Sequence, residues 1–194
     1  MKVLIDSPHG INTLGKQSPD GRIREYSYTR QLGLVLWQRL TAKGIDAVRF
    51  VPEEWDVSLP ERCRRVNAIA AKEPCLLISP HLNASPPTDG KWHNGRGFLA
   101  FVSPNASRKS KRFAQFLFDE AEKRGLKGNR WWPNDRYAVK NLAICRETSC
   151  PAVLTENLFQ DNREDVEYLL SDEGFNAIVD LHVAAILKYI ETYG

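Results

Sequence analysis

The chain has 194 residues, and its 27 basic and 24 acidic residues give a formal net charge of +3. That length suits one domain with a real hydrophobic core, and a content of 42% hydrophobic and 26% charged residues is ordinary for a globular protein. The charge is too small to indicate nucleic acid as a partner, although it is compatible with an anionic polymer. No apolar run approaches the roughly 18 residues of a membrane span. Only three apolar residues follow Lys2 before Asp6, so we expect no signal peptide.

Strand-like and helix-like segments alternate along the chain, which favours an α/β fold. Short apolar runs bounded by turn residues predict six strands, at Val3–Ile5, Ala47–Val51, Cys75–Ser79, Phe98–Val102, Leu142–Cys145 and Ala152–Thr155. Helical periodicity and capping residues predict helices at about Glu25–Lys43, Ser58–Ala71, Ser107–Arg124, Arg163–Leu170 and Glu173–Thr192. Residues 11–24, 84–95 and 125–141 are expected to be irregular. We therefore expect a single domain with a mostly parallel central sheet flanked by helices on both faces.

Two histidines stand at the ends of predicted strands. His9 follows the first strand and His81 follows the third, and Glu25 opens the helix between them. The C-terminal edge of an open α/β sheet is where ligands bind, and two imidazoles with one carboxylate suit zinc and leave a fourth position for water. Zinc lowers the pKa of such a water to about 7. Taken singly, each histidine is equally compatible with a turn residue, and Glu25 with a first-turn glutamate stabilised by the helix dipole.

Glu156 follows the strand Ala152–Thr155, so it too is expected at the C-terminal edge of the sheet. A metal hydrolase needs a base that takes a proton from water and passes it to the leaving group. Glu156 is the best candidate for that role.

The remaining histidines and the cysteines have simpler explanations. His182 lies on the apolar stripe of the last helix and is expected to be a packed core residue, whereas His93 falls in a loop. The cysteines form no C-x-x-C pair, which argues against a structural zinc site. Cys75 and Cys145 lie in apolar runs and are expected to act as small buried hydrophobes. The spacing of Cys145 and Cys150 allows a disulfide but does not establish one.

Six ordered motifs resemble those of the zinc-dependent N-acetylmuramoyl-L-alanine amidases, from Val3 to about Tyr189. The family's first strand ends in Asp-Pro-Gly-His-Gly, and its glutamate ligand opens the first helix. Its further motifs are written sLxeRxxxaN, SxHxNA, LR…PAvLvE…F and NpeD. Their counterparts here are Asp6–Gly10, Glu25, Ser58–Asn67, Ser79–Ala84, Cys145–Phe159 and Asn162–Asp165.

The resemblance implies that His9, Glu25 and His81 bind one Zn²⁺ and that Glu156 is the catalytic glutamate. Asn83 and Arg146, in the matched motifs, are candidate substrate-binding residues. Two positions depart from the family pattern: Pro8 replaces the usual glycine before the first histidine, and Asn157-Leu158 replaces a pair that usually contains glycine.

The loop 125–141 carries a pair of tryptophans, Trp131 and Trp132, beside basic residues. Aromatic faces suit sugar rings or stem-peptide side chains, so both are candidate substrate-binding residues. They suit equally well the covering of a hydrophobic flank.

The implied activity is hydrolysis of the amide between the lactyl group of N-acetylmuramic acid and the L-alanine of the stem peptide. Peptidoglycan is then the partner, and the enzyme acts on the cell wall in the periplasm, outside the cell or after delivery by a phage. We expect residues 1–194 to form the catalytic domain, with no separate cell-wall-binding domain. The alternatives are another zinc amide hydrolase, such as a carbohydrate deacetylase or a peptidase, and a non-catalytic peptidoglycan-binding module. No feature of the sequence specifies an oligomeric state.

Overall fold

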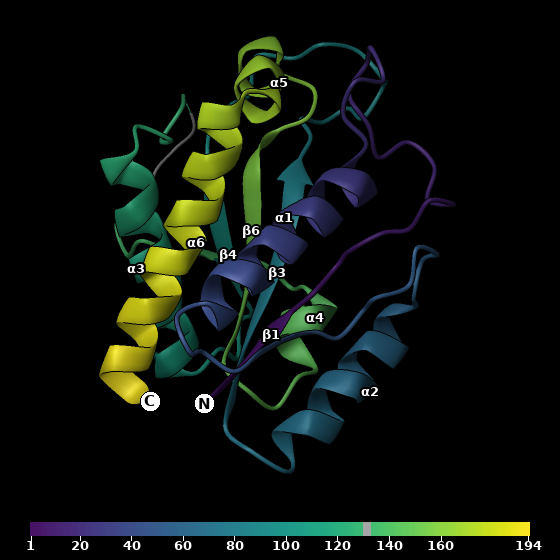
Figure 1. Ribbon diagram of the computed structural model, residues 1–194. Helices are drawn as coiled ribbons and strands as arrows, with labels where there is room; N and C mark the ends of the chain where they lie inside the picture. Colours follow the sequence, from purple (N-terminus) through teal and green to yellow (C-terminus); the bar gives the residue numbers. More distant parts are fainter. Residues whose placement is uncertain (130–132) are drawn as a thin grey trace.

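The computed structural model describes residues 1–129 and 133–194, and within them a six-stranded sheet has the order β2-β1-β3-β6-β4-β5 (Figure 1). The strands are β1 (Lys2–Ile5), β2 (Ala47–Arg49), β3 (Cys75–Asn83), β4 (Leu99–Val102), β5 (Ala138–Val139) and β6 (Ala152–Phe159). Strands β2, β1, β3 and β6 are parallel, β4 is antiparallel to β6, and β5 is parallel to β4. The predicted mostly parallel α/β sheet is confirmed.

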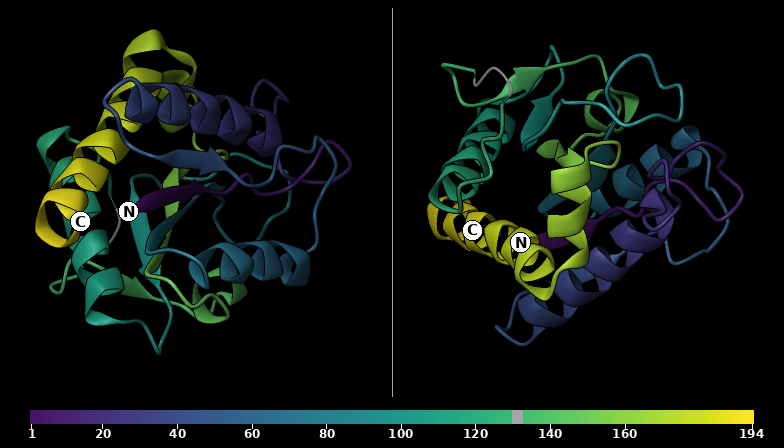
Figure 2. Two further views of the ribbon diagram at one scale, coloured as in Figure 1. Left: turned by 60° about the horizontal axis from the view of Figure 1, so that its bottom comes forward. Right: turned by 90° about the horizontal axis from the view of Figure 1, so that it is seen from above.

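Helices cover both faces of this sheet. One face carries four helices, α1 (Glu25–Thr41), α3 (Arg108–Lys123), α5 (Arg163–Leu170) and α6 (Asp172–Tyr193), and the other carries α2 (Leu59–Ala70) and α4 (Ala143–Arg146). The left view of Figure 2 shows α1 and α2 on opposite sides of the strands. Successive side chains of a strand point to opposite faces, so Val3 and Ile5 join the core under α1 and α6, while Leu4 joins the core under α2. The two termini lie side by side at the N-terminal edge of the parallel strands.

One predicted strand is wrong. The segment predicted as a strand at Leu142–Cys145 instead contains the single helical turn α4, Ala143–Arg146. The sheet still has six strands because β5, Ala138–Val139, forms within the segment expected to be irregular. The side chains of Ile144 and Cys145 still enter the core beneath α2. A short apolar run satisfies either conformation, because periodicity cannot separate a buried strand from a buried turn of helix over four residues.

Two other strands are longer than predicted. β3 continues past Ser79 to Asn83, and β6 continues past Thr155 to Phe159, so His81 and Glu156 lie within strands rather than beyond them. β3 runs through Pro80, although proline removes a backbone donor. The N–H groups of alternate residues face alternate neighbours, and the Leu77 N–H donates to the Pro151 carbonyl on the β6 side. The nitrogen of Pro80 therefore faces β1, whose pairing with β3 has already ended at Ile78.

His182 is a core residue, as predicted. Its ring is fully buried in α6, with Nε2 3.1 Å from the Thr155 hydroxyl and Nδ1 2.7 Å from the Ile178 carbonyl oxygen. No helix in the described part of the chain combines the length and apolarity needed to cross a bilayer.

Candidate metal centre and catalytic edge

His9 is held in an unusual backbone conformation where the chain leaves β1. Its φ of 59° lies in the left-handed region, which non-glycine residues rarely occupy. Gly10 follows it against the backbone of the segment before α2, and a Cβ on Gly10 would stand 2.0 Å from the Asp56 nitrogen. Only glycine fits there, so the close approach of the two segments fixes where the His9 ring lies.

The Glu25 carboxylate is the centre of the cluster. Its Oε1 atom lies 3.0 Å from His81 Nδ1 and 3.4 Å from His9 Nε2, and it accepts the Leu82 N–H at 3.1 Å. Oε2 is buried and has no hydrogen-bond partner among the described residues. Burial acts to raise the pKa of Glu25, but the hydrogen bonds and charges of His81 and His9 outweigh it and lower the pKa well below its ordinary value.

The ligand atoms of His9, Glu25 and His81 all lie within 4.8 Å of one another. The two imidazole rings meet edge to face with centroids 5.3 Å apart. Burial is the main cause that lowers the pKa of His81, and a neutral imidazole is the form that coordinates metals. Two imidazole nitrogens and a carboxylate with an unused buried oxygen form a donor set that fits zinc.

Glu156 stands beside this trio because β6 pairs with β3. The register aligns Glu156 with His81, although the two residues are far apart in sequence. Its Oε2 atom is buried without a hydrogen-bond partner among the described residues. Burial first, and then the negative charge of Glu25, raise the pKa of Glu156 to about 8, against the opposing effect of Lys140 and Lys16. A carboxyl group with a pKa near neutrality, next to a donor set for a metal, is typical of a catalytic acid–base residue.

A bulge follows Glu156 in the sheet. The pairing of β3 with β6 shifts between His81 and Asn83, and Leu158 has a φ of 68°. This is the Asn157-Leu158 position where the family usually carries glycine, which adopts such a φ without strain. In this chain Leu158 adopts the strained conformation itself. The bulge turns its side chain into the core under α5 and α6, away from the catalytic edge.

A buried ion pair between Asp6 and Arg62 lies next to the candidate site. The sequence alone assigns no role to these two residues. The carboxylate of Asp6 is fully buried and accepts Arg62 Nε at 3.0 Å and the Ser79 hydroxyl at 2.6 Å, with a further close contact to Arg62 Nη2. These residues join the end of β1 to α2 and β3. The sequence could have pointed to this group, because all three residues fall within the segments that resemble the amidase motifs.

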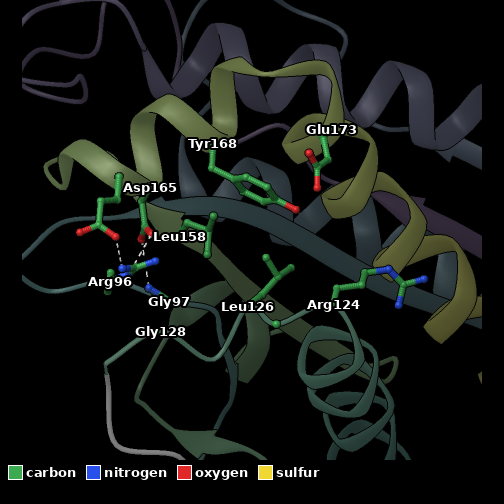
Figure 3. Close-up of a pocket in the computed structure, with 11 residues that line it drawn as sticks. Arg96, Gly97, Arg124, Leu126, Gly128, Leu158, Asp165, Tyr168 and Glu173 are labelled. Atoms are coloured by element: carbon green, nitrogen blue, oxygen red, sulfur yellow. Dashed lines mark hydrogen bonds and ion pairs between the residues drawn. The ribbon is translucent and has the colours of Figure 1, made fainter.

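Two of the cavities in the described part of the chain bear on this site. One of about 360 Å³ is lined by His9, His81, Arg62 and mainly apolar side chains from α2, α4 and β6. The other, of about 400 Å³, lies past the bulge, with Leu158 in its wall (Figure 3). Its charged side chains are largely engaged with the protein: Arg96 pairs with Glu164, and Asp165 accepts the Gly97 N–H at 3.0 Å. Of these two cavities, the first is the one lined by candidate metal ligands, His9 and His81.

The other candidate residues lie as follows. Asn83 ends β3, and its side-chain oxygen accepts the Ala84 N–H at 2.9 Å. Arg146 ends α4, where it contacts Asn141 and Glu147 and lines a separate cavity beside Ser103. The structure therefore does not bring Arg146 to the metal ligands. Trp131 and Trp132 fall outside the described residues, and their role stays a prediction.

Known proteins resemble this chain over nearly its whole length. The N-acetylmuramoyl-L-alanine amidase family matches residues 3–188. The endolysin of Bacillus phage SPP1 is 30% identical over 193 residues, covering 97% of this chain and 65% of the endolysin. The amidase CwlM of Bacillus licheniformis is 26% identical and is covered over 68% of its length. The chain thus spans about two thirds of the length of these curated relatives.

The fold also matches solved structures. The N-acetylmuramoyl-L-alanine amidase from Clostridium difficile 630 superposes with a TM-score of 0.84 at 24% identity, covering 100% of this chain and 98% of that one. The catalytic domain of CwlV from Bacillus (Paenibacillus) polymyxa gives a TM-score of 0.80 at 20% identity. From the family match over residues 3–188, we conclude that this chain belongs to the N-acetylmuramoyl-L-alanine amidase family.

Proposed function

We propose that the chain is a zinc-dependent amidase that cleaves the bond between N-acetylmuramic acid and the L-alanine of the peptidoglycan stem peptide. The observation that carries the proposal is the meeting of three donor atoms within 4.8 Å with the buried carboxyl group of Glu156. Membership of the amidase family supports the same reaction.

His9, Glu25 and His81 would hold the metal. The unused Oε2 atom of Glu25 supports this assignment, because a buried carboxylate oxygen without a partner is costly unless a ligand satisfies it. Zinc, when bound, supplies a Lewis acid that polarises a carbonyl and lowers the pKa of water.

Glu156 would move the proton. Its unpartnered Oε2 is able to accept a proton from the attacking water and to return it to the departing amine nitrogen of L-alanine. A pKa of about 8 is close to the pH at which such an exchange is efficient. A cation nearby would lower this pKa and favour the carboxylate, which is the form that accepts the proton first.

The surroundings of Glu156 suit a substrate with both apolar and anionic parts. The cavity beside His9 and His81 presents the apolar side chains of Leu59, Leu142 and Leu154, which suit methyl and methylene groups. Lys16 and Lys140 lie close enough to Glu156 to lower its pKa, and their charges suit the carboxylates of a stem peptide. Peptidoglycan combines these groups, so the enzyme would act at the cell wall, outside the cell or after delivery by a phage.

Product analysis tests this function directly. Muropeptides of defined structure are incubated with the zinc-loaded protein, and the products are identified by mass spectrometry and end-group analysis. We expect free L-alanine amino termini and intact N-acetylmuramic acid. Released acetate would identify a deacetylase, and new amino termini further along the stem would identify a peptidase. Binding of sacculi without any product would identify a non-catalytic module.

A further inference from the structure

A second group of reactive side chains lies at the opposite edge of the sheet from the metal ligands. Cys75 begins β3, and Cys150 precedes β6. Leu77 is in register with Ala152, so the same register carried two residues back sets Cys75 beside Cys150. Neighbouring strands are about 4.8 Å apart, and a disulfide spans Cα atoms about 4.4–6.8 Å apart. This placement of the two backbones is compatible with a disulfide.

The two thiols also lie close enough to interact. Their interaction lowers the pKa of Cys75 and raises that of Cys150. The sulfur of Cys75 thus has the greater thiolate character, and the thiolate is the nucleophilic form of cysteine.

A phenol without a partner faces this pair. Tyr189 of α6 is fully buried, and its hydroxyl has no hydrogen-bond partner among the described residues. Burial is the main cause that raises its pKa, and the nearby sulfurs of Cys150 and Cys75 raise it further. Both cysteines and Tyr189 line one cavity of about 170 Å³, with Lys109 also in its wall. A buried hydroxyl without a partner is costly, and here it is available to a ligand in the cavity.

We propose that Cys75, Cys150 and Tyr189 form a site that reacts with small hydroperoxides and closes a Cys75–Cys150 disulfide. The volume of the cavity suits a molecule the size of hydrogen peroxide, whereas a tripeptide disulfide is much larger. The site lies apart from the catalytic edge, and it does not depend on the amidase reaction.

The chemistry balances over two steps. The Cys75 thiolate attacks one peroxide oxygen, the O–O bond breaks, and the leaving oxygen takes a proton to become water while Cys75 becomes a sulfenic acid. Tyr189 is placed to donate a hydrogen bond to the leaving oxygen. Cys150 then attacks the Cys75 sulfur, the S–O bond breaks, and a second water leaves. The two thiols lose two electrons in total, and the peroxide is reduced to two molecules of water.

The other two cysteines provide an internal contrast. Burial raises the pKa of Cys145 to about 12 and is also the main cause that raises the pKa of Cys63. Both therefore stay protonated near neutral pH and should react slowly. Cys145 and Cys150 are both free thiols, and the register carried back from Leu77 and Ala152 sets Cys150 beside Cys75.

The test uses the full chain, hydrogen peroxide as the probe and thiol-specific mass spectrometry as the readout. We expect the chain to lose two hydrogen atoms and two titratable thiols, with Cys75 and Cys150 joined in one cross-linked peptide. The melting temperature should rise, because the bond closes a long loop, and dithiothreitol should reverse the change. The Cys63→Ser/Cys145→Ser variant is the matched control and should behave as the unmodified chain does.

Single substitutions separate the three roles. Cys150→Ser keeps a hydroxyl donor beside Cys75, so a sulfenic acid should accumulate there and be trapped by dimedone. Tyr189→Phe should slow disulfide formation roughly tenfold, the worth of one hydrogen bond to a charged group, without changing its product. Equal oxidation of all four cysteines, a Cys145–Cys150 bridge or unchanged thiols after treatment would each overturn the proposal. An unchanged rate in Tyr189→Phe would remove Tyr189 from it.

Discussion

The carboxyl groups of Asp6 and Glu156 have opposite surroundings in this protein. Asp6 follows β1, and both of its oxygens are bonded to Arg62 or Ser79. Glu156 lies in β6 with an oxygen that has no partner among the described residues. A buried carboxylate is tolerated when its oxygens are paired, whereas burial and the charge of Glu25 raise the pKa of Glu156. The paired group holds elements together, and the unpaired group is the one available for chemistry.

The largest effect on activity should come from removing one of the candidate metal ligands beside Glu156. His81→Ala removes one of three donors, so we expect it to abolish activity and to lose most of the one zinc per chain that the unmodified protein should hold. Metal analysis of purified protein checks this. His93→Ala is the control, because His93 contacts Asp89 in a loop and should leave the zinc in place. Full zinc occupancy in His81→Ala would mean that the metal site is elsewhere.

Glu156→Gln should leave the metal and lower turnover by roughly 10²–10⁴-fold, the usual worth of a general acid–base residue. The amide has nearly the same shape and no charge, so the melting temperature should not fall. Steady-state kinetics with muropeptides, run beside zinc analysis, separates the two contributions. Loss of zinc in this variant would make Glu156 a metal ligand, and unchanged turnover would exclude it from the reaction.

Breaking the ion pair between Asp6 and Arg62 should instead lower the stability of the fold. Arg62→Met leaves Asp6 buried without its partner, so the free energy of unfolding should fall by about 3–5 kcal/mol. Denaturant titration measures this. Arg64→Met is the matched control on the same helix, since Arg64 pairs with Glu61 at the surface, where ion pairs contribute only about 0–1 kcal/mol. Equal losses in the two variants would show that Asp6 is not specifically stabilised by Arg62.

His182 should give the smallest effect, seen as a pH dependence of stability. Burial lowers the pKa of His182 to about 4, whereas an unfolded histidine has a pKa of about 6.5. Between these values only the unfolded chain binds the proton. Its contribution to stability is therefore complete above pH 6.5 and is lost as the pH falls toward 4, by up to about 3 kcal/mol.

The comparison variant is His182→Gln, which keeps polar contacts and does not titrate. The difference in unfolding free energy between the two proteins should change between pH 7 and pH 4.5. A constant difference would show that His182 is not held neutral by its burial.

Much of this arrangement could be predicted from the sequence, because it depends on local patterns. The first strand and the long helices have clear apolar periodicity, His9 follows that strand and Glu25 opens α1, and His81 and Glu156 come directly after the runs that predicted β3 and β6. The bulge at Leu158 could not be predicted, since its φ results from pairing with β3. The extension of β3 through Pro80 depends on where β1 ends. The conformation of α4 is set by the core beneath α2, because its few apolar residues suit either a strand or a helical turn.

The strand order has a consequence for synthesis. β6 is the last strand to be made, yet it lies between β3 and β4 in the centre of the sheet. A nascent chain that ends before Ala152 contains β2, β1 and β3 on one side and β4 and β5 on the other, with nothing to join them. Such a chain already carries the three candidate metal ligands but lacks Glu156. β6 carries Glu156, so Glu156 lies beside His81 only after this last strand has emerged and inserted between β3 and β4.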